Sequence, residues 1–308
     1  MRSGWMSKSR WWRRASVLFA LVALTVSSVY QPAGAAQLGP DGARGTRLPG
    51  KFIWFELVTD DLAAASRFYE AVFGWRFRVV AGAPASYHLV ENDAGARVAG
   101  AFLHTPRQAG ARSARWLTLI SVPDVRASAQ YASGNGGSVV SAPRSFGDRG
   151  VHALLRDPEG ALFGVLSSDR GDPADTPVTD GDFFWVDLFA RDPERAAQFY
   201  GGLAGYEISE RETSLGVSRL VLQSQGYARG GVVPMPKGLE QPGWLPYVLV
   251  ADVAGTLDKA TAAGAKVLVK PRPGLLDGNL AVIADPQGGV VGIVNWTLGT
   301  GDSNGGSQ

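Results

Sequence analysis

An internal repeat constrains the fold of this chain more than any other feature of its sequence. The segments FIWFELVTDDLAAASRFYEAVFGW and FFWVDLFARDPERAAQFYGGLAGY, which begin at residues 52 and 183, align without a gap at an offset of 131. The alignment places Trp54 opposite Trp185, and Glu56 opposite Asp187. Self-similarity at a fixed spacing is typical of a duplicated structural unit, so both copies are expected to fold alike.

The repeat continues into the second half of each copy, at an offset of 128 residues. The matching residues there are Trp116 and Trp244, Asp124 and Asp252, Asp157 and Asp285, Gly160 and Gly288, and Gly164 and Gly292. The repeated unit is about 115 residues long, and the polar stretch DRGDPADTPVTDGD separates the two copies. We predict domains at residues 50–168 and 182–298, a linker at 169–181 and a flexible tail at 299–308.

Each copy alternates between strand and helix patterns. In the first copy, FIWFELV is typical of a strand, and Asp61 precedes an amphipathic stretch at residues 62–73 that ends before Gly74. Three short strands are predicted between residues 75 and 103. The second half repeats this order, with its helix beginning after Asp124. Each domain is therefore predicted to be α+β and to consist of two β-α-β-β-β modules.

The N-terminal 35 residues have the features of a secretory signal. The segment MRSGWMSKSRWWRR carries five basic and no acidic residues and leads into an apolar run of sixteen residues, fewer than the roughly twenty that an anchor helix needs. Ala33-Gly34-Ala35 offers a cleavage site before Ala36. We expect a signal peptide at 1–35, a linker at 36–49 and an exported protein, with a membrane as partner only if the signal stays uncleaved. The sequence leaves the export route open.

Composition and charge narrow the classes of function. The chain contains no cysteine, which excludes disulfides and thiolate metal sites. Without residues 1–35 it has 25 basic and 28 acidic residues, a net charge of −3 and no basic run, so nucleic acid is not an expected partner. The sequence contains no G-x-S-x-G elbow, phosphate-binding loop or dinucleotide fingerprint, and so gives no support for covalent hydrolysis or nucleotide chemistry.

The ordered motifs resemble the vicinal oxygen chelate superfamily, which includes glyoxalase I, the bleomycin resistance proteins and the extradiol dioxygenases. The shared features are paired β-α-β-β-β modules, a strand that leads into D-x-x-x-A-x-x-F-Y-x-x-x-x-G-W, and a closing D-P-x-G, over nearly all of residues 50–298. The resemblance implies that each pair of modules folds into an open barrel. In enzymes of that family the barrel holds a divalent metal through His, Gln and Glu, and the metal polarises vicinal oxygens of the substrate.

The positions that this resemblance assigns to metal ligands carry residues that cannot bind a metal. They are Trp54 and Trp185 on the first strand, Leu117 and Leu245 at the start of the second half, and Gly164 and Gly292 after D-P-x-G. The remaining ligand belongs on the fourth strand, where ARVAGAFL and GYARGGVV offer no His, Gln or acidic residue. No metal is therefore expected at the family site in either copy, and no other cofactor is predicted.

One carboxylate in each copy lies two residues beyond the tryptophan of the first strand. Because side chains alternate along a strand, Glu56 faces the same side as Trp54, and Asp187 the same side as Trp185. If that side is the barrel interior, each barrel presents a carboxylate beside an indole, which can stack on a flat or cationic ligand. These four residues are the predicted ligand-binding residues. The alternative is structural, with a hydrogen-bonded carboxylate and a tryptophan that fills the core.

The three histidines of the chain, His88, His104 and His152, all lie in the first copy. A displaced metal site made of Glu56 and two of these histidines is an alternative, although no H-x-x-x-H spacing supports it. The second copy has no histidine, so such a site cannot occur twice.

Three functions stay open at this point. The preferred hypothesis is an exported protein that binds a small molecule without the usual divalent metal, and no catalytic residue is assigned. The first alternative is a lyase or dioxygenase of the same superfamily with an atypical metal site. The second is a duplicated scaffold for protein–protein interaction. A monomer is predicted, because the duplication supplies within one chain the pseudo-symmetric partner that single-domain relatives obtain by dimerising.

Overall fold

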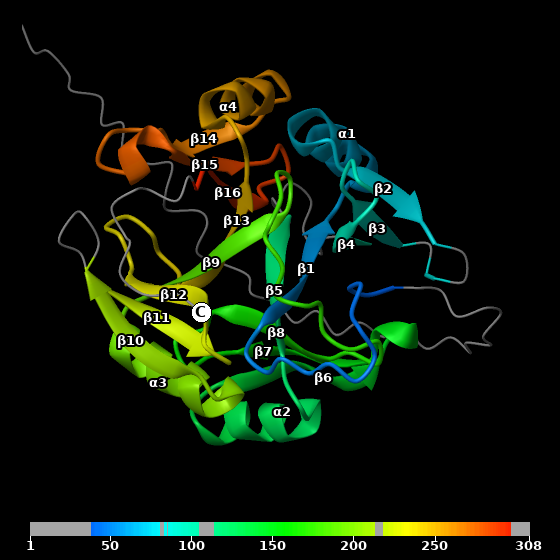
Figure 1. The fold of residues 1–308 in the computed structure, drawn as a ribbon, viewed down its shortest axis with the longest axis vertical. Helices are drawn as coiled ribbons and strands as arrows, with labels where there is room; N and C mark the ends of the chain where they lie inside the picture. The colour runs from blue at the N-terminus through cyan, green and yellow to red at the C-terminus, as the bar shows by residue number, and fades with distance from the viewer. Residues whose placement is uncertain (1–37, 81–82, 85, 105–113, 213–217, 297–308) are drawn as a thin grey trace, which may run out of the picture.

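The computed structural model describes residues 38–80, 83–84, 86–104, 114–212 and 218–296; the predicted signal and tail lie outside these ranges. Two domains follow one another along the chain (Figure 1). The first contains β1 (Phe52–Thr59), α1 (Leu62–Phe73), β2 (Arg76–Val79), β3 (Tyr87–Glu91), β4 (Arg97–Leu103), β5 (Arg115–Ser121), α2 (Val125–Gly134), β6 (Ser138–Ser145), the 3-10 helix η1 (Gly147–Arg149), β7 (Val151–Arg156) and β8 (Leu162–Ser167). The second contains β9 (Phe183–Ala190), α3 (Pro193–Ala204), β10 (Glu207–Glu212), β11 (Ser218–Ser224), β12 (Tyr227–Pro234), β13 (Gly243–Leu249), α4 (Val253–Ala262), β14 (Lys266–Val269), the 3-10 helix η2 (Leu276–Gly278), β15 (Leu280–Ala284) and β16 (Val290–Val294). Each domain shows the β-α-β-β-β order twice, which confirms the predicted α+β fold.

An aspartate begins each of these four α-helices. Its carboxylate accepts a hydrogen bond from a backbone N–H of the first turn and so satisfies a donor that the helix leaves unpaired. The four aspartates are Asp61, Asp124, Asp192 and Asp252. α1 and α3 then end at Gly74 and Gly205, whose φ angles of 73° and 74° favour glycine. The repeated aspartates and glycines of the sequence are therefore helix boundaries.

Each domain is built on one eight-stranded mixed sheet, in the order β2-β3-β4-β1-β5-β8-β7-β6 for the first and β10-β11-β12-β9-β13-β16-β15-β14 for the second. The first strand of each domain lies in the middle, parallel to the fourth strand and antiparallel to the fifth. Glu56 lies opposite Gly100 and Leu117, as Asp187 does opposite Gly231 and Leu245. The two domains therefore share one register around the candidate carboxylates.

The hydrophobic cores extend across the boundary between the domains. α1 lies beside α4, and α2 beside α3, at opposite ends of the molecule (Figure 1). One core joins α1, Trp75 and Trp116 to β13, α4, β15 and β16 of the second domain. The other joins α2, β7 and β8 to α3, β11 and β12. Burial of these apolar faces thus stabilises the two domains together.

Two smaller apolar clusters line the concave inner faces of the sheets. The cluster of the first domain contains Trp54, Tyr87 and Leu119, and that of the second contains Leu245 and Tyr247, with Trp185 packed against it. The sheets therefore place the predicted ligand-binding residues inside the two barrels.

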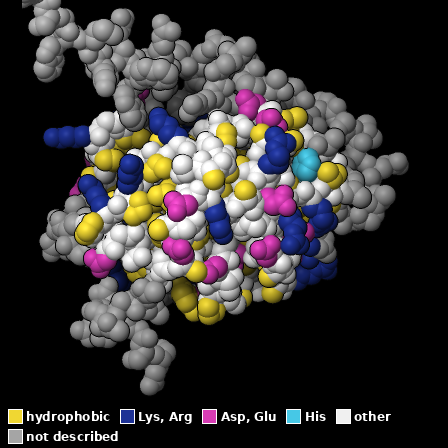
Figure 2. Space-filling view, turned by 90° about the horizontal axis from the view of Figure 1, so that it is seen from above, with side chains coloured by type: hydrophobic (Ala, Val, Ile, Leu, Met, Phe, Trp, Pro, Cys, Tyr) yellow, Lys and Arg dark blue, Asp and Glu magenta, His cyan; other side chains and the backbone are white. Residues whose placement is uncertain are grey.

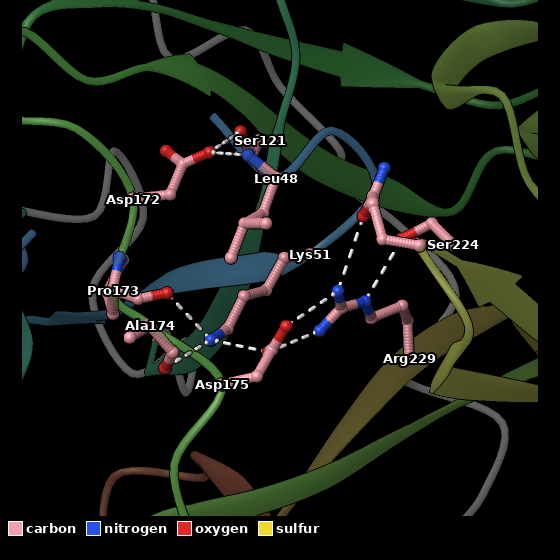
Figure 3. A network of polar contacts seen from close by, with 10 residues as sticks. Leu48, Lys51, Ser121, Asp172, Pro173, Ala174, Asp175, Ser224 and Arg229 are labelled. Carbon is pink, nitrogen blue, oxygen red and sulfur yellow. Dashed lines mark hydrogen bonds and ion pairs between the residues drawn. The ribbon is translucent and has the colours of Figure 1, made fainter. Parts of the chain in front are cut away.

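A polar network ties the linker between the domains to the segment that precedes β1 (Figure 3). Asp172 accepts a hydrogen bond from the backbone N–H of Leu48 at 2.6 Å and is fully buried. Asp175 pairs with Lys51 at 2.8 Å and with Arg229 of β12 at 2.6 Å. The linker is thus held by partners from both domains.

The outer surface near α1 and α4 mixes charges of both signs with small hydrophobic patches (Figure 2). A groove of about 320 Å³ lies between these two helices and is lined by Ala64, Arg67, Phe68, Ala263 and Pro286. Among the described residues, no helix is both long and apolar enough to cross a membrane.

Candidate functional site

The family metal positions are occupied by packed side chains in both domains. On β8, a Cβ atom at Gly164 would lie 2.6 Å from Leu119 Cγ, and on β16, a Cβ atom at Gly292 would collide with the ring of Tyr247. Each glycine leaves space for a side chain of the neighbouring strand. A glutamate in place of either glycine would displace that side chain. The residues at the former ligand positions therefore do not fit a divalent metal.

The histidines do not replace the missing ligands. His152 lies on β7 inside the first barrel, whereas His88 follows Tyr87 on β3 and so points to the opposite face of the sheet. Within the described ranges, no group of three or more His, Asp or Glu side chains is placed to hold a metal ion. Glu56 and the histidines thus do not form the displaced metal site considered above.

In the first barrel, Glu56 forms an ion pair with Arg149, which belongs to η1 and is 0 % exposed. The guanidinium Cζ lies 4.5 Å from the ring centroid of Phe146, and Nη2 lies 3.4 Å from His152 Nδ1. Burial, followed by the nearby Arg149 charge, lowers the pKa of His152 to about 2. The imidazole is therefore neutral near pH 7. Trp54 is 1 % exposed beside this cluster, so the inner face of the first barrel is filled.

In the second barrel, Asp187 is the centre of a hydrogen-bonded cluster. Its Oδ1 accepts from Trp185 Nε1 at 2.9 Å, and its Oδ2 pairs with Arg219 Nη2 at 3.2 Å. Burial raises the pKa of Asp187, against the lowering effect of Arg219 and the hydrogen bonds. The carboxylate fixes the orientation of both the indole and the guanidinium.

The second barrel is more open than the first. Trp185 is partly exposed, and the side chain of Arg219 is 31 % exposed. The Cζ of Arg219 lies 6.0 Å from the ring centroid of Trp185, and its Nε has no hydrogen-bond partner among the described residues. Partly buried apolar side chains surround the cluster: Phe184, Phe189, Val269, Leu280 and Val290. This face offers an indole surface next to a partly exposed cation.

The structure places Trp54 and Glu56 on the inner face of the first sheet, and Trp185 and Asp187 on that of the second. The sequence interpretation did not identify the arginines that pair with the two carboxylates. Arg149 comes from η1 of the first domain, whereas Arg219 comes from β11 of the second. Their positions do not correspond in the repeat, so no alignment of the two copies could find them. A buried carboxylate in each copy is itself a signal that a cation lies nearby.

Comparison with known families gives two matches that cover most of the chain. The family described as Glyoxalase/Bleomycin resistance protein/Dioxygenase superfamily matches residues 51–165, and the Glyoxalase-like domain family matches residues 184–294.

Two curated relatives span nearly the same length. A Mycobacterium tuberculosis protein named "Putative glyoxylase CFP32" is 30 % identical over 243 residues, which are 78 % of this chain and 93 % of the relative. The anthracycline biosynthesis protein DnrV of Streptomyces peucetius is 27 % identical over 273 residues, 84 % of this chain and 98 % of the relative.

Solved structures with the same fold include a Mn(II)-bound glyoxalase and an extradiol ring-cleaving dioxygenase. The Mn(II)-bound glyoxalase from Novosphingobium aromaticivorans has a TM-score of 0.55 at 15 % identity, covering 81 % of this chain and 83 % of that one. An extradiol ring-cleaving dioxygenase from B. fuscum has the same TM-score and identity, with 87 % and 78 % covered. At these identities, the similarity extends to the fold alone.

Proposed function

This chain belongs to the glyoxalase/bleomycin resistance protein/dioxygenase superfamily, and we propose that it binds a flat organic molecule bearing an anionic oxygen in its second barrel, without a metal ion. The observation that carries this proposal is the cluster of Trp185, Asp187 and Arg219 on an inner face that is partly open. An indole accepts a flat ring by stacking, and a guanidinium binds carboxylate or phenolate oxygens through charge-assisted hydrogen bonds.

The role of Asp187 in this proposal is to position the two groups that touch the ligand. Each of its carboxylate oxygens holds one donor, Trp185 Nε1 or Arg219 Nη2, and this leaves the indole face and the rest of the guanidinium for the ligand. Pre-organised side chains lose less rotamer entropy on binding, which favours affinity.

The relative DnrV gives further support for a flat ligand. It is named for the biosynthesis of anthracyclines, which are planar, oxygenated aromatic compounds. A ligand of this kind matches the pairing of Trp185 with Arg219, and the residues at the former metal positions do not fit the metal chemistry of the family's enzymes. The alternative of a metal-dependent lyase or dioxygenase therefore lacks a ligand set among the described residues.

The proposal is tested by calorimetric titration of the mature protein with anthraquinone-2-carboxylate and with the neutral anthraquinone-2-carboxamide. We expect tighter binding of the carboxylate, no effect of prior dialysis against EDTA, and a loss of affinity of about tenfold or more in Arg219→Gln. Arg219→Lys keeps the charge, and Arg195→Gln removes an exposed arginine of α3 as a matched control. Equal affinities in Arg219→Gln and Arg195→Gln, or binding that EDTA abolishes, would contradict the proposal.

We also propose that the protein acts outside the cytoplasm, after cleavage before Ala36. The support is the basic segment and the apolar run of residues 1–35. N-terminal sequencing of the protein recovered from culture medium or cell envelope tests this, and an intact Met1 on exported protein would overturn the cleavage site.

A further inference from the structure

We infer that the first barrel is a binding site for a short leucine-containing peptide segment, and that the chain's own segment around Leu38 occupies it as an internal ligand. The assignment concerns the first barrel only and does not depend on the proposed function of the second.

The side chain of Leu38 lies inside the first barrel. It is 2 % exposed and belongs to the same apolar cluster as Trp54, Tyr87 and Leu119. Leu38 precedes β1 in the chain and is not part of any strand or helix. A residue from outside the sheet therefore fills the concave face on which Trp54 and Glu56 were predicted to meet a ligand.

Both backbone groups of Leu38 are bound by side chains of the barrel. Its N–H donates to Asp148 Oδ1 at 2.9 Å, and its carbonyl accepts from the Tyr87 hydroxyl at 2.7 Å. Recognition of one apolar side chain together with the donor and acceptor of its own backbone is how proteins hold short peptides. These contacts come from the side chains of Tyr87 on β3 and Asp148 on η1, and not from backbone pairing with a strand, so the pocket recognises Leu38 as a peptide unit.

The residues around Leu38 and Gly39 pack closely against both of them. A Cβ atom at Gly39 would lie 2.7 Å from Arg149 Cγ, and a Cβ atom at Gly147 would lie 2.9 Å from Leu38 Cδ1. The pocket thus fits the dipeptide Leu-Gly closely on both sides.

The segment that follows Leu38 and Gly39 is held at several points and is exposed between them: Pro40 is buried, and Asp41 pairs with Arg97 at 3.0 Å. Ala43, Arg44 and Gly45 are exposed, and no atom lies within 4 Å of the position that a Cβ of Gly45 would take. The chain is held again at Thr46, whose carbonyl accepts from the Asp172 N–H at 3.0 Å, and at Leu48, whose N–H donates to the Asp172 carboxylate. Leu38 is therefore a ligand on a short tether that is anchored from Asp41 onward, and short tethers give effective concentrations in the millimolar range.

The second barrel has no matching insertion among its described residues. The register places Arg219 where the first barrel has Tyr87, since these residues approach the equivalent glycines Gly231 and Gly100. A tyrosine donates to a peptide carbonyl, whereas an arginine favours an anionic oxygen. The two barrels therefore differ in the class of ligand that they accept.

The first test uses hydrogen exchange of the unmodified mature protein. If Leu38 is a tethered ligand, its amide exchanges by local release, at least tenfold faster than the amides of β1. If its amide exchanges only as fast as β1, the segment is part of the cooperative fold and the assignment is overturned.

The second test adds a synthetic peptide, AQLGPDGA, labelled at its C-terminus, and measures fluorescence anisotropy. We expect Leu38→Asp, which releases the tether, to bind the peptide saturably. The wild type and the matched surface variant Arg44→Asp are expected not to bind it, because their site is occupied. A peptide with aspartate in place of leucine serves as the negative probe. A folded Leu38→Asp protein that binds neither peptide, or both equally, would sink the assignment; Leu38→Ala serves in its place if the aspartate prevents folding.

Discussion

The hydroxyl of Tyr69 donates to Asp285 Oδ2 at 2.9 Å, across the boundary between the two domains. The same hydroxyl accepts from Trp116 Nε1 at 2.8 Å. The equivalent residues form the same contact in the opposite direction, from the second domain to the first: Tyr200 donates to Asp157 at 3.2 Å and accepts from Trp244 at 3.0 Å. All four hydrogen bonds involve residues by which the repeat is recognised in the sequence. The motif therefore marks the seam between the domains and carries no direct information about a ligand.

Tyr69→Phe and Tyr200→Phe are each expected to lower the free energy of unfolding by about 1–3 kcal/mol. Each substitution removes a buried hydroxyl and leaves an indole N–H and a carboxyl without that partner. Urea unfolding checks this, with Tyr227→Phe as the exposed control. The effects of the two seam variants should add, because the two clusters share no residue; no loss in either variant would show that the seam does not depend on these bonds.

Gly164→Ala is expected to destabilise the protein by about 1–3 kcal/mol, because the new Cβ would collide with Leu119. Gly134→Ala is the matched control: it lies in α2 with nothing within 4 Å of its Cβ position, and it should be neutral or slightly stabilising. Thermal unfolding of the two variants distinguishes them. Equal melting temperatures would mean that the former metal position is not closed by packing.

His152 is expected to make the protein less stable as the pH falls. Its folded-state pKa of about 2 lies below the unfolded value near 6.5, so below pH 6.5 the unfolded state takes up a proton that the folded state does not. The neutral His152 contributes fully to the free energy of unfolding above pH 6.5. Below that pH the free energy of unfolding falls by about 1 kcal/mol per pH unit. His152→Leu, which copies Leu280 of the second barrel, should remove this slope in urea unfolding at pH 7 and pH 5. An unchanged slope would show that His152 is not the group responsible.

Asp187→Asn is expected to tighten binding of anthraquinone-2-carboxylate severalfold, opposite in sign to Arg219→Gln. The amide still accepts from Trp185 but no longer neutralises the guanidinium, which leaves more of its charge for the ligand. Calorimetric titration measures the change, with near-ultraviolet circular dichroism to check that the barrel stays folded. Weaker binding in Asp187→Asn would show instead that the carboxylate touches the ligand, or that its orientation of Arg219 contributes more to affinity than its neutralisation of the guanidinium costs.

The elements of this fold were predictable from local signals, whereas the sites were not. Asp61 and Gly74 mark the two ends of α1. The start of a helix needs a side-chain acceptor and its end often needs a residue with positive φ, and both residue types can be recognised in the sequence. The packing of α1 against α4 depends on contacts between residues about 200 positions apart, for which no local pattern exists. Arg149 and Leu38 lie in short irregular segments without periodicity, so nothing in the sequence indicated that they enter the first barrel.

The crossed cores give the four modules the connectivity of a closed ring. Sheet pairing joins the first module to the second and the third to the fourth, and helix packing joins the second to the third and the fourth to the first. In such a ring every module contacts two others, so the order of the modules along the chain decides only where the connecting segments lie. A circular permutant, in which the present termini are connected and the new termini lie in the linker at 169–181, would preserve all four of these contacts between modules.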